Sequence, residues 1–503
     1  MTAFERLRTA CGIIRDLEHT AAVLDWDQQT FMPVNAEPDR VCQLTSLAGV
    51  IHEKKTSPDF ASALEAAEKE CRDLPPESVE ACLIRKLRRE FEKQSRIPAA
   101  LVTSLAESSA LAHGAWAQAR EQSKFGLFAP HLERLLELRR QYAELFAPYE
   151  NIYDPLLDDF EEGYTARQLD ALFAELRKKL VPLFRRIIAA QPGAECPAGI
   201  YPEKEQLAFT GEIIRALGYD LTRGRQDQSA HPFTTGFGLN DVRITTRVFP
   251  EMPLSALLSS IHECGHALYE QGISRELDRT PLADGASYGF HESQSRLWEN
   301  LVGRSRAFWE YCFPVFRRYF PDQLENATPE QIWRAVNHVE ATLIRTESDE
   351  VTYNLHIMLR YEMEKELLAG TLAVKDAPAA WNAKSRELLG VEPENDAEGI
   401  LQDIHWSMGE FGYFPTYALG NLLAAQTWCA AEAQVAGLER EIAKGNFRPL
   451  LGFLREHVHV YGAKFTPADT LEKALGTREI DPDCFLKLLE RKYAQICGFR
   501  CSD

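Results

Sequence analysis

Helical patterning dominates this sequence and limits the folds that it can adopt. From residue 1 to about residue 190, segments rich in Ala, Leu, Glu and Arg follow one another with the hydrophobic pattern of helices. Short Pro-containing turns, such as Leu74-Pro75-Pro76, separate these segments, and we find no flexible linker or internal repeat. We therefore predict a mainly α-helical fold in which residues 1–503 form a single domain.

A strand pattern is clear only between residues 240 and 248. Apolar or β-branched residues alternate there with polar ones, at Val242, Ile244, Thr246 and Val248. The alternation predicts a half-buried strand whose other face carries Arg243, Thr245 and Arg247. The stretch before it, from Gln191 to about Phe237, is irregular, and long irregular loops are often functional.

The charge and the cysteine content of the sequence limit the classes of function and the cellular compartments that we expect for this protein. The sequence has 56 Lys and Arg residues against 75 Asp and Glu residues, and its net charge of −19 repels nucleic acids and anionic lipid surfaces. The first residues are charged and precede no apolar stretch, and the most apolar later segment is too polar to span a membrane. Eleven scattered cysteines without a C-x-x-C pair are typical of reduced thiols. We expect a cytoplasmic protein that binds neither nucleic acids nor membranes.

The segment 254–272 carries the clearest chemical signal. Its apolar residues follow the three-to-four spacing of a buried helix face, with a Pro before the segment and a Gly at its end. On the other face, His262 and His266 lie one turn apart and point the same way. Such a pair binds a metal ion at about 2.0–2.1 Å, and Glu263 lies beside the open coordination position, as a general base would. Cys264 falls on the apolar face and is expected to pack in the core.

A third ligand is expected from a neighbouring helix. Glu292 in His291-Glu292-Ser293-Gln294 is the first choice, because this segment follows His266 after a Gly-containing turn. His291 is an alternative ligand. Glu299, two turns further along, either hydrogen-bonds a ligand His or is a solvated surface acid. The three-His pattern H-E-x-x-H-x-x-G-x-x-H is not met, so a glutamate-ligated site fits better.

The two-His pattern alone leaves other interpretations open. Five residues with three specified recur by chance in about one or two of every hundred chains of this length. A helical binding protein whose His pair holds no metal is therefore a rival of another class. The strongly patterned helix and the carboxylates that follow it favour a metal centre.

Further segments along the chain extend this pattern. They are Leu24-Asp25-Trp26-Asp27, His231-Pro232-Phe233, Asp241-Val242-Arg243-Ile244-Thr245, Ile344-Arg345-Thr346-Glu347 and Gly399-Ile400-Leu401-Gln402-Asp403-Ile404-His405-Trp406. Together with the two His-Glu segments, and in this order, they are highly specific. On these residues the sequence resembles the carboxypeptidase Taq family of metallocarboxypeptidases, from residue 24 into the final quarter of the chain.

The resemblance implies a large helical zincin-like metallopeptidase with a long substrate groove and a small β-sheet near the active site. Its N-terminal helices, about residues 1–190, would form one wall or lid of the groove. The resemblance also implies an intracellular homodimer that removes C-terminal residues from peptides with a free C-terminus, with broad preference and poor action on Pro. His262, His266 and Glu292 then correspond to the metal ligands, and Glu263 to the catalytic carboxylate. We expect one divalent ion per subunit; Zn²⁺ is favoured, and Co²⁺ or Mn²⁺ suits the same ligands.

An exopeptidase that acts at a C-terminus must bind a free carboxylate, and a guanidinium fork is well suited to this. Arg345 is the candidate, and the resemblance associates its motif with carboxylate recognition. We expect it on a helical stretch, with Asp349 and Tyr353 at successive i+4 steps. A structural Arg345–Asp349 helix pair is the alternative.

A neutral donor opposite the metal would stabilise the charge that develops on the scissile oxygen. The available donors are His405, Tyr413 and Tyr417, and the sequence does not choose between the two tyrosines. The resemblance implies that the segment with Arg243 and Thr245 limits the reach of the substrate, whereas an edge-strand row of charges is the competing explanation. His231 is a candidate for a contact with the substrate or with a ligand.

The sequence thus predicts a metallocarboxypeptidase in which Glu263 takes a proton from the attacking water and returns it to the leaving amine. The nearest alternative function is that of a related helical-zincin oligoendopeptidase. Such an enzyme cuts internally and tolerates a blocked C-terminus.

Overall fold

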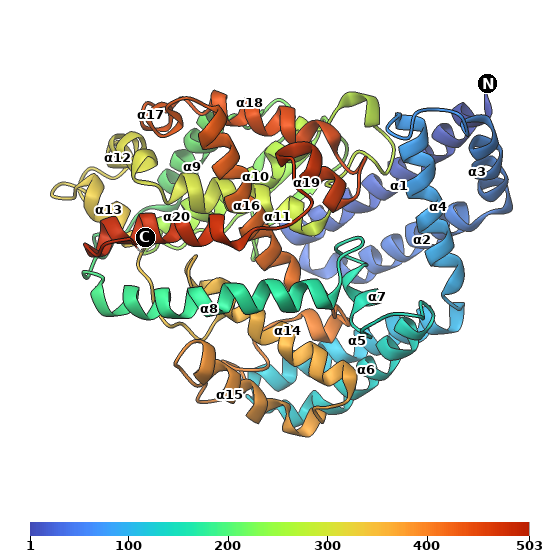
Figure 1. Ribbon diagram of the computed structural model, residues 1–503, viewed down its shortest axis with the longest axis horizontal. Coiled ribbons are helices and arrows are strands. Elements are labelled where there is room, and N and C mark those ends of the chain that lie inside the picture. Colours follow the sequence, from blue (N-terminus) through green and yellow to red (C-terminus); the bar gives the residue numbers. More distant parts are fainter. Residues whose placement is uncertain (502–503) are drawn as a thin grey trace.

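The computed structural model describes residues 1–501 and is mainly helical, as predicted (Figure 1). The first α-helices are α1 (Ala3–Thr30), α2 (Glu37–Thr56), α3 (Pro58–Glu70), α4 (Val79–Arg96), α5 (Ala99–Glu121), α6 (Ala129–Glu144), α7 (Asp154–Leu157), α8 (Ala166–Ala190), α9 (Glu203–Leu217) and α10 (Pro253–Gly272). The others are α11 (Tyr288–Arg296), α12 (Arg306–Tyr319), α13 (Pro329–Val336), α14 (Tyr353–Ala369), α15 (Ala377–Leu388), α16 (Pro415–Gln434), α17 (Leu438–Ala443), α18 (Arg448–His457), α19 (Pro467–Leu475) and α20 (Pro482–Cys497).

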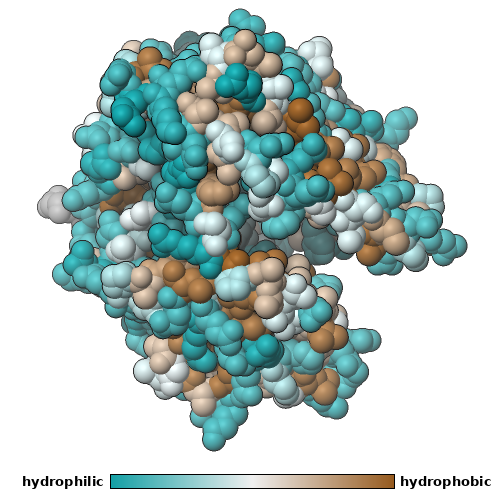
Figure 2. All heavy atoms as spheres, turned by 90° about the vertical axis from the view of Figure 1, so that its right-hand side faces the viewer, coloured by the Kyte–Doolittle hydropathy of each residue, from teal (hydrophilic) through white to brown (hydrophobic). Residues whose placement is uncertain are grey.

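The helices form an upper and a lower group. Figure 1 shows α1 to α4 at one end of the upper group and α5, α6, α14 and α15 in the lower group. The long helix α8 runs between the lower group and α20, which it contacts. In the upper group, α11 packs against both α10 and α16. The face at the right of Figure 1 is hollowed between the two groups (Figure 2).

The small sheet contains three strands in the order β1-β3-β2, namely β1 (Gln226–Gln228), β2 (Thr234–Gly236) and β3 (Val242–Thr246). β1 runs parallel to β3, and β2 runs antiparallel to it with Thr234 opposite Ile244. The predicted strand is therefore present but ends at Thr246, before Val248. The polar face of this strand is also less exposed to solvent than the alternating pattern predicted. Thr245 is fully buried, and its hydroxyl accepts hydrogen bonds from the backbone N–H of Phe233 and from the Ser229 hydroxyl.

We predicted that residues 191–237 are irregular, and this prediction is wrong for the central part of the stretch. It contains the 15-residue helix α9. Apolar residues of α9 recur at helical spacing and are buried, namely Phe209, Ile213, Ile214 and Leu217. They pack this helix against α10 and α12. The local period was present in the sequence, but the Pro- and Gly-containing flanks of the stretch masked it.

Two clusters of buried apolar side chains meet near α10 and α11. The larger cluster joins most helices from α5 onward, and it includes Cys264, which packs in the core as expected. The smaller cluster joins α1, α3 and α4 to α10 and α11 through Tyr269 and Phe290. The polar side of α10 therefore lies where the N-terminal helices meet the rest of the molecule. Each of these helices buries the apolar side chains along one of its faces, as amphipathic helices do.

Two features of the chain relate to its environment. All eleven cysteines are free thiols. Within residues 1–501, none of the helices combines the length and the apolar content needed to cross a membrane.

Candidate metal centre and active site

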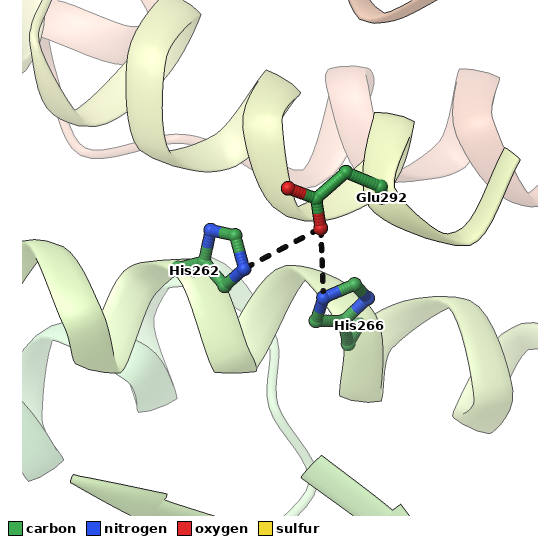
Figure 3. A group of neighbouring side chains, drawn as sticks. All are labelled: His262, His266 and Glu292. Carbon is green, nitrogen blue, oxygen red and sulfur yellow. Dashed lines mark ion pairs between the residues drawn. The ribbon is translucent and has the colours of Figure 1, made fainter. Parts of the chain in front are cut away.

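Two helices bring the three predicted ligands together (Figure 3). α10 spans Pro253–Gly272, as predicted, and presents His262 and His266 from successive turns. α11 presents Glu292, and its Oε2 lies 3.6 Å from Nε2 of His262 and 3.4 Å from Nε2 of His266. Each residue offers one ligand atom within 4.8 Å of the other two, a grouping that no other potential metal ligands in residues 1–501 match.

The spacing of these atoms fits a metal ion better than direct hydrogen bonds. Both N–O distances exceed the usual hydrogen-bond range of about 2.7–3.2 Å. Neighbouring ligands of a tetrahedral zinc ion, with bonds of about 2.0–2.1 Å, are about 3.3–3.4 Å apart. Two imidazoles and one carboxylate are also a typical donor set of a catalytic zinc site, which keeps its fourth position open. The residues present therefore fit a divalent metal.

Two glycines allow Glu292 to approach the histidines. At Gly265, a Cβ atom would lie 2.6 Å from Cα of Ser295 and 2.7 Å from the carbonyl oxygen of Gln294, so α10 and α11 touch backbone to backbone there. At Gly420 of α16, a Cβ atom would lie 2.6 Å from Cγ of Glu292. Such distances are too short for any larger residue without displacement of the backbone or of the ligand. The second variable position of the His-Glu-x-x-His segment is thus a packing position.

The structure decides the role that the sequence left open for Glu299. This carboxylate lies in η4, a π-helical continuation of α11 (Leu297–Gly303), and its Oε2 is 2.9 Å from Nδ1 of His262. Arg296 and Arg304 also donate hydrogen bonds to it. Burial opposes ionisation, but Arg296 and His262 hold the pKa of Glu299 well below its usual value. Glu299 is therefore an ionised partner of a ligand His and not a surface acid.

Arg296 also binds the ligand carboxylate itself, and sequence reasoning missed this residue. Its Nε donates to Oε1 of Glu292 at 2.6 Å. Burial raises the pKa of Glu292, yet Arg296 and the two imidazoles more than compensate, so the pKa lies well below its usual value. Oε2 of Glu292 is left to face the two histidines (Figure 3). The i+4 spacing of these two residues was the available signal.

Glu263, the predicted general base, is 7% exposed and lies between the two ligand turns. The Thr234 hydroxyl donates to its Oε2 at 2.6 Å. Burial raises the pKa of Glu263, whereas His262 and Thr234 oppose this shift. Thr234 belongs to β2, a strand that sequence reasoning did not find, so the small sheet holds the carboxylate of α10.

A cleft of about 700 Å³ opens onto these groups. Its lining comes from α4, from the segment after α7, from β2, α10 and α11, and from the start of α16. The residues are Lys86, Arg89, Glu90, Lys93, Asp158, Asp159, Phe160, Glu162, Phe233, Thr234, His262, Glu263, His266, Glu270, Asp284, Gly285, Ala286, Ser287, Tyr288, His291, Glu292, Tyr413, Thr416 and Tyr417. The N-terminal helices thus supply part of the wall that faces the metal centre.

The predicted donors lie together beside this cleft. Tyr413 and Tyr417 line it, with ring centroids 5.3 Å apart. His405 is buried behind them, and its Nε2 lies 3.3 Å from the Tyr417 hydroxyl. Burial lowers the pKa of His405 to about 3, so its imidazole is neutral at pH 7. A neutral imidazole can orient the Tyr417 hydroxyl without adding charge.

Arg345 does not occupy the helix that its neighbours in sequence indicated. It begins a 3₁₀ turn (η5, Arg345–Glu347), and no hydrogen bond or ion pair joins it to Asp349. Its guanidinium instead binds Oδ1 of Asp403 at 2.7 Å and the Tyr353 hydroxyl at 2.7 Å. The helical-pair alternative is therefore wrong, because Asp349 accepts backbone N–H groups at the start of the next helix.

A second guanidinium shares the same carboxylate. Arg360 binds Oδ2 of Asp403 at 2.6 Å and is fully buried. Two cations and one anion leave this buried group with a surplus positive charge. The Arg345 guanidinium carbon lies 4.8 Å from the ring centroid of Tyr417, which separates it from the cleft.

The other three predicted substrate-binding residues lie around the small sheet, outside the cleft lining. Arg243 forms a two-bond ion pair with Asp241 and lies 4.4 Å above the Trp26 ring. Thr245 is buried and holds the 229–233 loop, as described above. His231 is exposed, and its carbonyl accepts the Ser229 hydroxyl.

Comparisons with known proteins show the family of this chain. The sequence profile of the carboxypeptidase Taq (M32) metallopeptidase family matches residues 6–493. The chain is 42% identical to thermostable carboxypeptidase 1 of Thermus thermophilus, with 96% of each protein covered. It is 36% identical to carboxypeptidase 1 of Bacillus subtilis, again with 96% of each covered. The crystal structure of an M32 carboxypeptidase from Deinococcus radiodurans superposes with a TM-score of 0.96 at 44% identity, over 99% of this chain and 100% of that one. The chain therefore belongs to the carboxypeptidase Taq (M32) family and is a metallocarboxypeptidase, a hydrolase of peptide bonds.

Proposed function

We propose that this enzyme releases single amino acids from the free C-terminus of peptides. One observation carries the proposal: Arg345, Arg360 and Asp403 form a buried group with surplus positive charge behind Tyr417, which lines the cleft of the metal centre. A buried surplus charge is costly until an anion approaches it. The C-terminal carboxylate of a peptide in the cleft would be that anion. Tyr417 lies between the carboxylate and the guanidinium groups, and it would either move aside or donate a hydrogen bond.

We infer that Glu263 is the general base and then the general acid. A divalent metal held by His262, His266 and Glu292 would polarise the scissile carbonyl and lower the pKa of a water molecule in its open position. Glu263 accepts the proton of the attacking water and returns it to the leaving amine. Burial raises its pKa, which favours acceptance of the proton, and the Thr234 hydroxyl binds one of its two carboxylate oxygens.

The developing charge on the scissile oxygen needs a neutral donor. Tyr417 is our first choice, because His405 contacts its hydroxyl while Tyr413 contacts its ring. Burial raises the pKa of Tyr417 well above its usual value, so the hydroxyl keeps its proton. A preorganised donor of this kind typically contributes about 3–4 kcal/mol to the transition state.

Broad specificity with poor action on Pro is also part of the proposal. The mixed lining of the cleft supports the first point, since charged, aromatic and small residues face it without a single dominant chemistry. Poor action on Pro rests on the family resemblance. Arg243 and its contacts with Trp26 and Asp241 are proposed to close one end of the groove, and His231 to lie at its rim.

We further propose a cytoplasmic homodimer with Zn²⁺ as the metal and with residues 1–190 as a wall or lid within a single domain. Eleven free cysteines support a reducing compartment. The part of the cleft lining that comes from α4 supports the lid. The dimer rests on the family resemblance, and light scattering of the purified protein tests it.

Mass spectrometry of a peptide and its C-terminally amidated twin tests the activity. Each peptide is incubated with the enzyme as purified, after chelation, and after chelation followed by Zn²⁺. Stepwise loss of residues from the free peptide alone, abolished by chelation and restored by Zn²⁺, is the expected result. Internal cuts in both peptides would instead identify an oligoendopeptidase.

A further inference from the structure

His291 precedes the predicted ligand Glu292 in α11, and both of its ring nitrogens contact polar atoms of neighbouring side chains. Its Nδ1 lies 2.6 Å from Nδ1 of His266, and its Nε2 lies 3.3 Å from Oε1 of Glu270. All three side chains line the cleft of the metal centre. The chain of contacts therefore runs from a carboxylate through one imidazole to a second imidazole.

Packing holds this imidazole in place. Its ring lies 4.7 Å from the ring of His266 and 5.3 Å from that of Tyr269, measured between centroids. On another side, a Cβ atom at Gly285 would lie 2.7 Å from Cδ2 of His291. The ring is thus enclosed by two aromatic neighbours and a glycine backbone.

Glu270 lies at the other end of the chain of contacts. It lies one turn beyond His266 on α10, and Gly236 of β2 approaches it closely, since a Cβ atom there would meet Oε2 at 2.1 Å. The carboxylate therefore lies against the backbone of β2. Its remaining oxygen faces Nε2 of His291.

The direction of the hydrogen bonds follows from the ligand role of His266. Its Nε2 faces Glu292, so a neutral ring that coordinates through this atom carries its hydrogen on Nδ1. Two facing ring nitrogens share one hydrogen, which makes Nδ1 of His291 the acceptor. The hydrogen of His291 then lies on Nε2, which faces Oε1 of Glu270 at 3.3 Å.

The two ligand histidines are supported differently. His262 contacts the carboxylate of Glu299 directly, whereas an imidazole stands between His266 and Glu270. His291 is also no fourth ligand, because both of its nitrogens are engaged and it lies outside the group of three ligand atoms.

We propose that His291, oriented by Glu270, is a positioning residue that fixes the tautomer and the ring orientation of His266. This inference rests on the metal centre of the proposed function. It predicts that loss of the acceptor at Nδ1 of His291 weakens metal binding even when the three ligands are intact.

Two substitutions at His291 separate this role from packing. His291→Phe keeps the ring volume but removes the acceptor. His291→Asn is smaller, yet its side-chain oxygen lies near the former Nδ1 position and can accept from His266. His52→Phe, at an exposed position on α2, is the matched control.

The measurement is zinc affinity of the zinc-loaded enzyme in competition with a chelator, with circular dichroism to verify folding. We expect His291→Phe to bind zinc about 10–100-fold more weakly, with His291→Asn recovering most of the loss and the control unchanged. Glu270→Gln, at a partly buried site, should weaken binding less than His291→Phe, because it removes the charge and retains a polar partner.

The outcomes distinguish the two proposals. If the unmodified enzyme binds no stoichiometric metal, the proposed function fails. If it binds zinc but His291→Phe binds equally well, or if His291→Asn binds as poorly as His291→Phe, the positioning role is overturned.

Discussion

Nδ1 of His262 lies 2.9 Å from Oε2 of Glu299, and the same carboxylate accepts hydrogen bonds from Arg296 and Arg304. The contact fixes which nitrogen of His262 carries hydrogen and leaves Nε2 for the metal. Glu299 therefore acts on the metal centre through another residue, although it lies in a different helical segment from its partner.

Glu299→Gln should bind zinc about 10–100-fold more weakly, because the amide lacks the charge that orients and polarises His262. Chelator competition measures the change. Glu310→Gln, in an exposed part of α12, serves as the control. Unchanged zinc affinity in Glu299→Gln would contradict the assigned role.

Glu263→Gln should keep its zinc but lose about 10²–10⁴-fold in kcat, because the amide cannot accept a proton from the attacking water. Metal analysis and peptide turnover are measured on the same sample. A variant that retains both zinc and turnover would remove Glu263 from the mechanism.

Arg345→Ala should lower kcat/KM on free peptides by about 10–150-fold, which corresponds to the loss of a charged hydrogen bond of about 1.5–3 kcal/mol. Residual cleavage of amidated peptides should change little. Arg317→Ala, whose guanidinium binds only a backbone carbonyl at the surface, is the control. An equal loss on both peptide types would argue against carboxylate recognition.

Gly265→Ala should destabilise the protein by about 1–3 kcal/mol, since the new methyl group meets the backbone of Ser295 and Gln294. The displacement of α11 should also weaken zinc binding through Glu292. Gly452→Ala, in α18 with open space around it, should be neutral or slightly stabilising. Urea unfolding with and without zinc compares the two variants, and equal behaviour would disprove the close-packing argument.

The raised pKa of Glu364 predicts that the free energy of unfolding depends on pH. The buried carboxylate accepts hydrogen bonds from Tyr153, Trp406 and the Gly412 backbone, and burial raises its pKa from 4.5 to about 7. Because the folded pKa is raised, its contribution to stability is present below pH 4.5 and is lost as the pH rises through about 7.

The free energy of unfolding of Glu364→Gln should therefore depend less steeply on pH across this window, by up to about 1.4 kcal/mol per pH unit. Urea titrations between pH 4.5 and 8 measure the slopes. Identical slopes in both proteins would show that this carboxyl group does not titrate there.

Several parts of the site could be predicted because they depend on local spacing. Two histidines four residues apart on an amphipathic helix face the same way in any fold, so the pairing of His262 and His266 required no tertiary information. Glu292 followed as the first carboxylate on the next helix. The family and its architecture came from the combination of motifs along the chain, and the comparisons confirm both.

Other parts were wrong or missing because they depend on residues distant in sequence. The helical environment of Arg345 was inferred from its neighbours, but Asp403, 58 residues away, decides its contacts. Thr245 looked available from strand alternation, yet the loop that carries Ser229 covers it. Thr234 gave no signal, since its role depends on the register of β2 beside α10.

By itself, the sequence determined the helical class, the bounds of α10 and the donor set of the metal centre, because each follows from the helical repeat and from side-chain chemistry. Only the tertiary structure decided that His291 supports His266 instead of binding metal, and that Glu299 supports His262. The physical reason is that the hydrogen-bond partners of these histidines depend on how closely α10 and α11 pack. The two helices contact each other at Gly265. Periodicity along one chain segment carries no information about that distance.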